Sequence, residues 1–257
     1  MRYFIATLLA GVAIGTAAAQ TSSTGPSATS EPGLIPRTVD GKPDFSGFYA
    51  IPYTPNMAKG KEEDVPYTDR GRQAYLNHDS KDDPTANCWF PGVPRIMQSP
   101  YPVQIVQSRD YLVLLFEYMT MFRSIPFSGR PHPSKMDPTF MGDSVGHWEG
   151  DILIVDTTML KDAPWTWLDT AGHQHSDALH VIERFHRLPD IIDYEFTVDD
   201  PKMYTKPWTH SRPLKPLKLV SGLPPLLEYN CDENNRDVKH LISTKPAVDP
   251  GSNQGRR

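Results

Sequence analysis

Short segments rich in β-branched and aromatic residues recur through the middle of this chain, and each is bounded by a turn signal. The chain also has 26 prolines and 17 glycines, which interrupt it too often for long helices. This pattern predicts antiparallel hairpins that follow one another in sequence. The segments that we expect to be strands are residues 103–107, 111–122, 147–158 (with a hairpin turn at Glu149-Gly150-Asp151), 180–186, 191–198, 204–212 and 226–230.

About eight antiparallel strands in sequence favour an all-β fold. We expect a barrel or a sandwich, because closure of a sheet removes its exposed edges. We expect a helix only at residues 69–79.

The two ends of the chain differ in composition from its middle. Residues 1–19 combine Arg2, an apolar run and small residues before Gln20, which predicts a secretory signal peptide. The apolar run is too short for a membrane span, so we expect a periplasmic or secreted protein without a span after cleavage. We expect a flexible leader at residues 20–36, one domain at residues 37–244 and a disordered tail at residues 245–257.

Charge and cysteine content narrow the class of protein further. The formal net charge is −5, and cleavage of the predicted signal peptide removes only Arg2, which gives −5 − 1 = −6. Lysine and arginine are scattered, so a nucleic-acid partner is not expected. Cys88 and Cys231 both fall in the exported part and should form one disulfide, although two separate buried thiols would also fit.

Residues 171–185, AGHQHSDALHVIERF, gather three histidines, an aspartate and a Glu-Arg pair at the start of a predicted strand. Three interpretations are open. Asp177 could orient His175 for proton transfer. Alternatively, His173, His175 and His180 could contribute to a metal site, or the segment could be a polar strand end in which Asp177 caps a turn. In the strand itself, Val181, Glu183 and Phe185 should share one face.

Further polar residues lie in the loops and strands around this stretch. Arg123 follows an aromatic segment, Arg130 and His132 lie in a proline-rich loop, and Asp143 and His147 flank a glycine. Trp165, Trp167, Trp208, Tyr118, Phe122, Tyr204 and Phe140 are close to these groups in sequence, and an aromatic pocket with a few polar groups is typical of small-molecule sites. The chain lacks a G-x-S-x-G elbow, a P-loop, an H-E-x-x-H motif and a dinucleotide glycine fingerprint.

Nearly the whole mature chain resembles a family of exported, mostly uncharacterised bacterial proteins. The resemblance rests on PDFSG (43–47), CWFPGVPR (88–95), GRPHP (129–133), GHWEGD (146–151) and HSDALHVIER (175–184), among other segments. It implies an antiparallel lipocalin-like barrel with an irregular N-terminal extension. Some relatives are similar to lyases that act on lignin-derived aromatic dimers. The resemblance carries over no nucleophile and no metal set.

We therefore expect a cofactor-independent lyase or isomerase that acts by general acid-base chemistry on a small aromatic or phenolic compound. On a lignin-type dimer, His175 would take a hydroxyl proton, a C–C bond would break to release formaldehyde, and Arg123 or Tyr118 would stabilise the oxyanion. The alternatives are a lipocalin-like carrier without catalysis and a carbohydrate-processing enzyme. The candidate catalytic residues are His175, Asp177, His147, Tyr118 and Arg123, and the candidate substrate-binding residues are Arg130, His132, Trp167, His180 and Tyr204. We expect His147, His175 and His180 to converge in one cavity.

Overall fold

The structure is a computed structural model that describes residues 33–233. The predicted signal peptide, the predicted tail and most of the predicted leader lie outside these residues. Within them, no helix has the length and apolarity that a membrane span requires.

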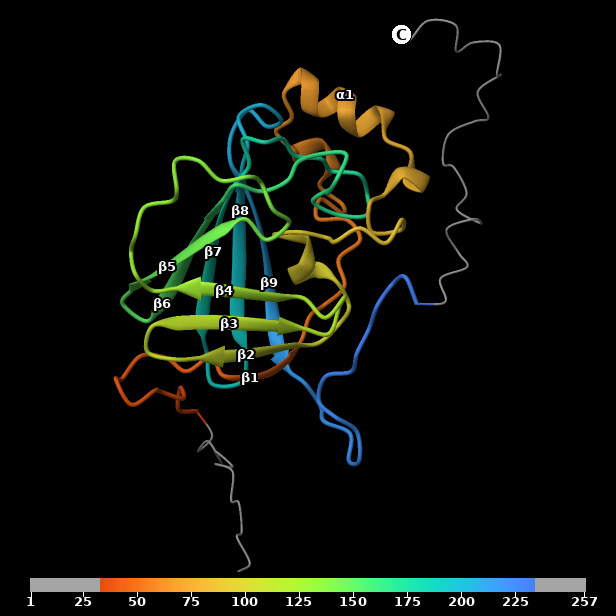
Figure 1. Ribbon diagram of the computed structural model, residues 1–257. Coiled ribbons are helices and arrows are strands. Elements are labelled where there is room, and N and C mark those ends of the chain that lie inside the picture. Colours follow the sequence, from red (N-terminus) through yellow and green to blue (C-terminus); the bar gives the residue numbers. More distant parts are fainter. Residues whose placement is uncertain (1–32, 234–257) are drawn as a thin grey trace, which may run out of the picture.

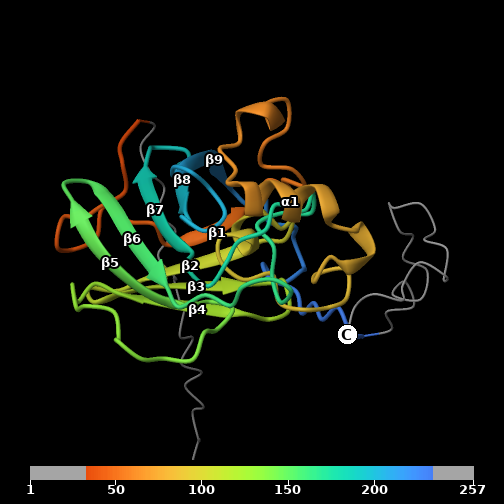
Figure 2. The same ribbon diagram turned by 90° about the horizontal axis from the view of Figure 1, so that it is seen from above.

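Nine antiparallel strands form one sheet in the order β4-β3-β2-β1-β9-β8-β7-β6-β5, and the sheet curls into a nearly closed, lipocalin-like barrel (Figures 1 and 2). The strands are β1 (Gly47–Ala50), β2 (Val103–Gln107), β3 (Tyr111–Phe116), β4 (Phe122–Pro126), β5 (Asp143–Glu149), β6 (Ile152–Thr158), β7 (His180–Arg187), β8 (Ile192–Asp199) and β9 (Trp208–Pro216). The helices are η1 (Glu62–Asp64), α1 (Asp69–Asn77), η2 (Ser80–Asp82) and η3 (Arg95–Gln98). The prediction of an all-β antiparallel barrel is confirmed.

The predicted hairpins agree with the structure in most places. β2 has the predicted bounds, β7 is one residue longer than predicted, and β8 and β9 lie one and four residues later than predicted. Gly150 has the positive φ of 61° that the turn between β5 and β6 requires. The predicted helix is α1, which Thr68 caps by accepting a hydrogen bond from the Gly71 amide.

Two strand predictions were wrong, and one strand was missed. The run 111–122 is two strands, because the chain reverses at residues 117–121, where Met119 and Thr120 take positive φ without the help of glycine. Residues 226–230 contribute only an isolated bridge between Tyr118 and Tyr229. The short strand β1, which joins the two halves of the sheet, was not predicted.

Side chains, and not a backbone ladder, close the barrel. β4 and β5 are the two ends of the sheet in the described chain, so neither strand has a second hydrogen-bonded neighbour. They approach closely at Gly146, where an added Cβ would lie 2.9 Å from Phe127 Cδ1. A glycine at this point of β5 therefore lets the two edges meet.

A buried ion pair spans the same gap. The Arg123 guanidinium on β4 forms a bidentate pair with Glu183 on β7, and it also donates to Ser144 on β5 (3.0 Å) and Thr157 on β6 (2.7 Å). The Tyr194 hydroxyl on β8 donates to Glu183 as well, at 2.7 Å. The network thus connects five strands inside the barrel. It also confirms that Glu183 lies on the buried face of its strand, with Val181 and Phe185.

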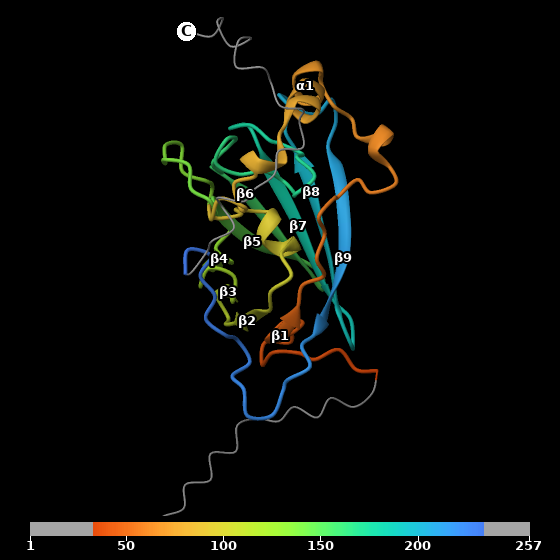
Figure 3. The same cartoon turned by 90° about the vertical axis from the view of Figure 1, so that its right-hand side faces the viewer.

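The short helix η3 fills one end of the barrel. All four of its residues are buried, and Ile96 and Met97 are fully enclosed in the hydrophobic core. Figure 3 shows this yellow segment between the walls formed by β2–β4 and β7–β9. Because η3 occupies this end, its two terminal residues, Arg95 and Gln98, are held at the boundary between the core and the surrounding loops.

We predict that Glu183→Gln destabilises the protein by about 3–5 kcal/mol, because it leaves the Arg123 charge buried without its partner. Urea unfolding of the variant and the wild type gives this difference. Arg130→Met is the matched control, since it breaks the exposed Arg130–Asp143 pair and should cost less than about 1 kcal/mol. Equal losses in the two variants would contradict a special role for the buried pair.

Candidate functional site: a tyrosine-lined pocket

A cavity of about 200 Å³ lies where the turn between β3 and β4 meets η3 and the C-terminal segment. We call it the tyrosine pocket. Its wall includes Tyr101, Tyr118, Tyr229, Arg95, Gln98 and Thr170.

Three tyrosine rings form one side of the tyrosine pocket. The ring centroids of Tyr101 and Tyr118 are 4.9 Å apart, those of Tyr101 and Tyr229 are 4.5 Å apart, and those of Tyr118 and Tyr229 are 5.5 Å apart. Tyr101 lies two residues before β2, whereas Tyr118 lies in the turn after β3 and pairs with Tyr229 through the isolated bridge. Rings at these separations give an aromatic surface of the kind on which another ring packs.

The hydroxyls of Tyr118 and Tyr101 hold their protons at neutral pH. Burial raises the pKa of Tyr118 to about 12, and the neighbouring Tyr229 adds to this shift. Burial also raises the pKa of Tyr101, with a further contribution from its hydrogen bond to Tyr229. These groups can therefore donate hydrogen bonds or protons, but they do not act as bases at neutral pH.

Arg95 is the charged side chain in the wall of the tyrosine pocket. It is only 5% exposed, and its Nη2 donates to Asp83 (2.7 Å), to Thr85 (2.8 Å) and to Thr170 (3.2 Å). Asp83 is equally buried, so the charges of Arg95 and Asp83 compensate each other. Gln98 is held beside Arg95 by a hydrogen bond from its Nε2 to the Leu168 carbonyl.

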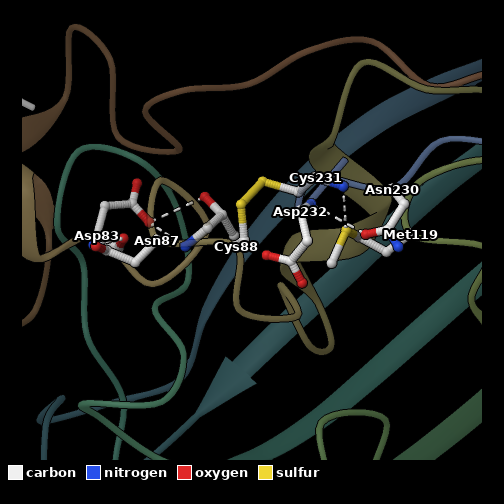
Figure 4. The surroundings of a disulfide bond; sticks show 8 residues. Asp83, Asn87, Cys88, Met119, Asn230, Cys231 and Asp232 are labelled. Atoms are coloured by element: carbon white, nitrogen blue, oxygen red, sulfur yellow. Dashed lines mark hydrogen bonds between the residues drawn. A yellow bond between two sulfur atoms is a disulfide. The ribbon is translucent and has the colours of Figure 1, made fainter. Parts of the chain in front are cut away.

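A disulfide fixes the third wall of the tyrosine pocket. Cys88 and Cys231 are bonded with their Cα atoms 5.4 Å apart, which confirms the predicted pairing (Figure 4). The Cys231 amide also donates to Met119 Sδ at 3.1 Å, in the turn that carries Tyr118. These two links hold Tyr229, two residues before Cys231, against the pocket.

The predicted His175–Asp177 pair is wrong. His175 is buried, with its Nδ1 3.2 Å from the Ser176 carbonyl, and burial lowers its pKa. Asp177 is exposed and accepts a hydrogen bond from Lys202 Nζ at 2.6 Å, and this bond lowers the pKa of the Asp177 carboxyl. The two side chains therefore have separate partners.

The predicted convergence of His147, His175 and His180 is also wrong. His147 is exposed on β5 and contacts Glu149 at 3.5 Å, whereas His180 bonds to Asp156 and His175 is enclosed. His147 pairs with Ile154 of β6, whereas His180 of β7 is level with Thr158 of β6. These two positions on β6 are four residues apart, which corresponds to roughly 13 Å along a strand.

Three of the predicted substrate-binding residues do meet, but outside the barrel. Asp143 lies 2.6 Å from His132 Nδ1 and forms a bidentate pair with Arg130, while Asp156 lies 2.9 Å from His132 Nε2 and 2.7 Å from His180 Nε2. The hydrogen bond from Arg130 and that from His132 lower the pKa of Asp143. Asp143, Asp156 and His180 lie on β5, β6 and β7, next to residues that face the core. Their contacts with Arg130 and His132 therefore fasten the 127–142 loop to the outer surface.

The remaining predicted residues are divided between the core and two pockets. Tyr118 belongs to the tyrosine pocket, and Trp167 lines a separate, polar pocket beside the end of α1. Tyr204 is buried and donates to the Gln174 carbonyl at 2.8 Å. Arg123 is engaged in the barrel network, so the structure gives it a structural role in place of the predicted oxyanion contact.

His173 is the histidine of the 171–185 stretch that a carboxylate orients. Its Nδ1 lies 2.7 Å from Asp169 Oδ2, and Asp169 also accepts a hydrogen bond from the Met57 amide at 2.8 Å. Both residues are enclosed, and His173 Nε2 has no hydrogen-bond partner among the described residues. No group of three histidine, cysteine, aspartate or glutamate residues within 33–233 is arranged to hold a metal ion.

Sequence reasoning missed Arg95, Gln98, Tyr101 and Tyr229. The predicted disulfide contained the relevant signal, because it places CWFPGVPR beside LLEYNC and therefore brings Arg95 and Tyr229 to the same end of the barrel.

Comparison with known proteins finds no matching family model, no matching curated protein and no matching solved structure. The resemblance described above therefore stays a prediction.

We predict that the Cys88→Ser/Cys231→Ser double variant is strongly destabilised. The disulfide joins residues 143 positions apart, and the chain-entropy model gives about 5 kcal/mol for a loop of this length. Denaturant unfolding measures the loss, and intact-mass analysis confirms the bonded state of the wild type. An unchanged unfolding midpoint in the double variant, or two free thiols in protein made in an oxidising compartment, would contradict the disulfide.

We also predict a loss of stability at alkaline pH. The Tyr118 pKa is about 12 in the folded protein and about 10 in the unfolded chain. Its contribution is therefore complete below pH 10 and is lost as the pH rises to 12, because the unfolded chain releases the proton first. Tyr118→Phe should make the decline of the unfolding free energy between pH 10 and 12 less steep, and a slope equal to that of the wild type would rule out this assignment.

Proposed function

We propose that this protein binds a small aromatic compound in the tyrosine pocket and acts as a lipocalin-like carrier. The arrangement of Tyr101, Tyr118 and Tyr229 around one cavity is the observation that carries the proposal.

The size of the pocket favours a compound with one ring. An apolar cavity of about 150 Å³ holds benzene, so the 200 Å³ of the tyrosine pocket suits a single substituted ring. A dimeric compound would have to leave its second ring outside the pocket.

The chemistry of the pocket wall favours binding over proton transfer. Tyr118 and Tyr101 are protonated at neutral pH, and Arg95 is paired with Asp83. Such groups orient a ligand by hydrogen bonds, whereas a general base must accept a proton near neutral pH.

We predict that Tyr229→Ala weakens the binding of single-ring aromatic compounds at least about tenfold, because it removes one wall of the pocket and its ring contact. Isothermal titration calorimetry with a panel of such compounds provides the measurement. Tyr111→Ala is the control, since Tyr111 is exposed at the opposite end of β3 and should leave binding unchanged. If no compound of the panel binds to the wild type, the proposed function is wrong.

The second candidate function is a cofactor-independent lyase on aromatic compounds. The Asp169–His173 pair favours it, because a carboxylate-oriented imidazole with an unpartnered Nε2 is the arrangement of a general base. Asp169 is also the neighbour in sequence of Thr170, which lines the tyrosine pocket.

Incubating the wild type with the same panel and with lignin-type dimers that carry a side-chain CH₂OH group, followed by mass spectrometry, separates the two functions. A carrier returns every compound unchanged, which is the result that we expect. Conversion with release of formaldehyde would establish the lyase instead, and His173→Gln should then abolish turnover while binding in the tyrosine pocket remains.

We propose in addition that the protein is exported and that residues 1–19 are cleaved. The disulfide supports this proposal, because such bonds persist mainly in oxidising compartments. The mature N-terminus should be Gln20, and an intact mass that retains residues 1–19 would contradict the cleavage.

A further inference from the structure

Two polar atoms of the tyrosine pocket residues lack partners. Within the described chain, Arg95 Nη1 and Gln98 Oε1 are buried without a hydrogen bond. Buried polar groups are normally paired, because an unpaired one costs about 1–3 kcal/mol. Both belong to residues that line the same cavity, at the two ends of η3.

The two atoms differ in what they require. Arg95 Nη1 can only donate a hydrogen bond, whereas Gln98 Oε1 can only accept one. The orientation of the Gln98 amide is fixed by the bond from its Nε2 to the Leu168 carbonyl. A hydroxyl group serves both atoms, because it accepts from the first and donates to the second. A carboxylate or an ether can only accept, so it leaves Gln98 Oε1 unpaired.

The charge of the pocket wall also favours an uncharged ligand over an anion. Among the described residues of the wall, Arg95 is the charged side chain, and the buried Asp83 carboxylate lies 2.7 Å from its Nη2. An anionic ligand would therefore bring a second negative charge to an arginine that is already neutralised. Burial of a charge without a counter-charge is costly.

On the basis of the proposed function, we propose that the ligand is an uncharged aromatic hydroxyl compound. Its ring packs against the tyrosines, and its hydroxyl group accepts from Arg95 Nη1 and donates to Gln98 Oε1, while Gln98 Nε2 keeps its bond to the Leu168 carbonyl. Arg95 and Gln98 thus determine which single-ring compounds are bound.

The experiment compares three probes of similar size with the oxidised wild-type protein at pH 7. Phenol is uncharged and has a hydroxyl group, anisole replaces the hydroxyl proton by a methyl group, and benzoate is an anion. We expect phenol to bind roughly tenfold to hundredfold more tightly than anisole, because anisole leaves the buried Gln98 Oε1 unpaired, and more tightly than benzoate by at least this factor. Calorimetric titration or ligand-observed NMR measures the three affinities.

A variant tests the role of Gln98 itself. Gln98→Met keeps the length of the side chain but removes the acceptor, so the preference for phenol over anisole should fall toward unity. The ratio of the two affinities is the readout, because a general loss of packing would weaken both probes equally. Ser108→Ala, in the distant turn between β2 and β3, should keep the wild-type ratio.

The outcomes separate this inference from the proposed function. Anisole or benzoate binding as tightly as phenol would overturn the hydroxyl inference and leave the binding of aromatic compounds intact. Failure of all three probes, together with the wider panel, would overturn both. A phenol preference that survives Gln98→Met would remove Gln98 from the recognition.

Discussion

The ion pair between Arg123 and Glu183 is the interaction on which the barrel depends. β4 and β5 have no backbone ladder to join them, so the sheet would be an open, curled surface without a link across this gap. The guanidinium supplies that link by donating to oxygens on β5, β6 and β7. Burial of two charges costs several kcal/mol, and the bonds that surround the pair offset this cost. The pair therefore acts mainly to select one closed arrangement of the nine strands.

Closure in this manner leaves the tyrosine pocket at the end of the barrel. The interior is occupied by the ion pair, by large side chains such as Phe185 and Tyr194, and by Ile96 and Met97 of η3. The tyrosine pocket lies where η3 meets the loops, and the disulfide holds the segment that carries Tyr229 there as a wall. Site and fold are thus connected through η3, because its middle residues fill the core and its end residues line the tyrosine pocket.

The sequence predicted the parts of the fold that obey local rules. The alternation of side chains identified β7 and its buried Glu183, because a strand has a period of two residues. Gly150 identified the turn after β5, because a tight hairpin turn needs a residue that tolerates a positive φ. The chain reversal at Met119 and Thr120 could not be predicted in this way, since neither residue type is typical of a turn. The tyrosine pocket was missed for a different reason. Its residues come from segments before β2, after β3 and near Cys231, which are far apart in the sequence. The predicted disulfide was the one sequence feature that indicated that such segments meet.

The histidine-rich stretch shows why residue type alone is a poor guide to a site. His175 was expected to be a base, but its enclosure disfavours the charged form, and Asp177 is bonded to Lys202. The imidazole that a carboxylate does orient is His173, two residues earlier, where Asp169 also anchors the Met57 amide. Asp169 directly precedes Thr170, which lines the tyrosine pocket. This short segment therefore connects the oriented imidazole with the pocket along the chain. The structure thus separates the tyrosine pocket from the oriented imidazole, because His173 is fully enclosed and does not line that pocket.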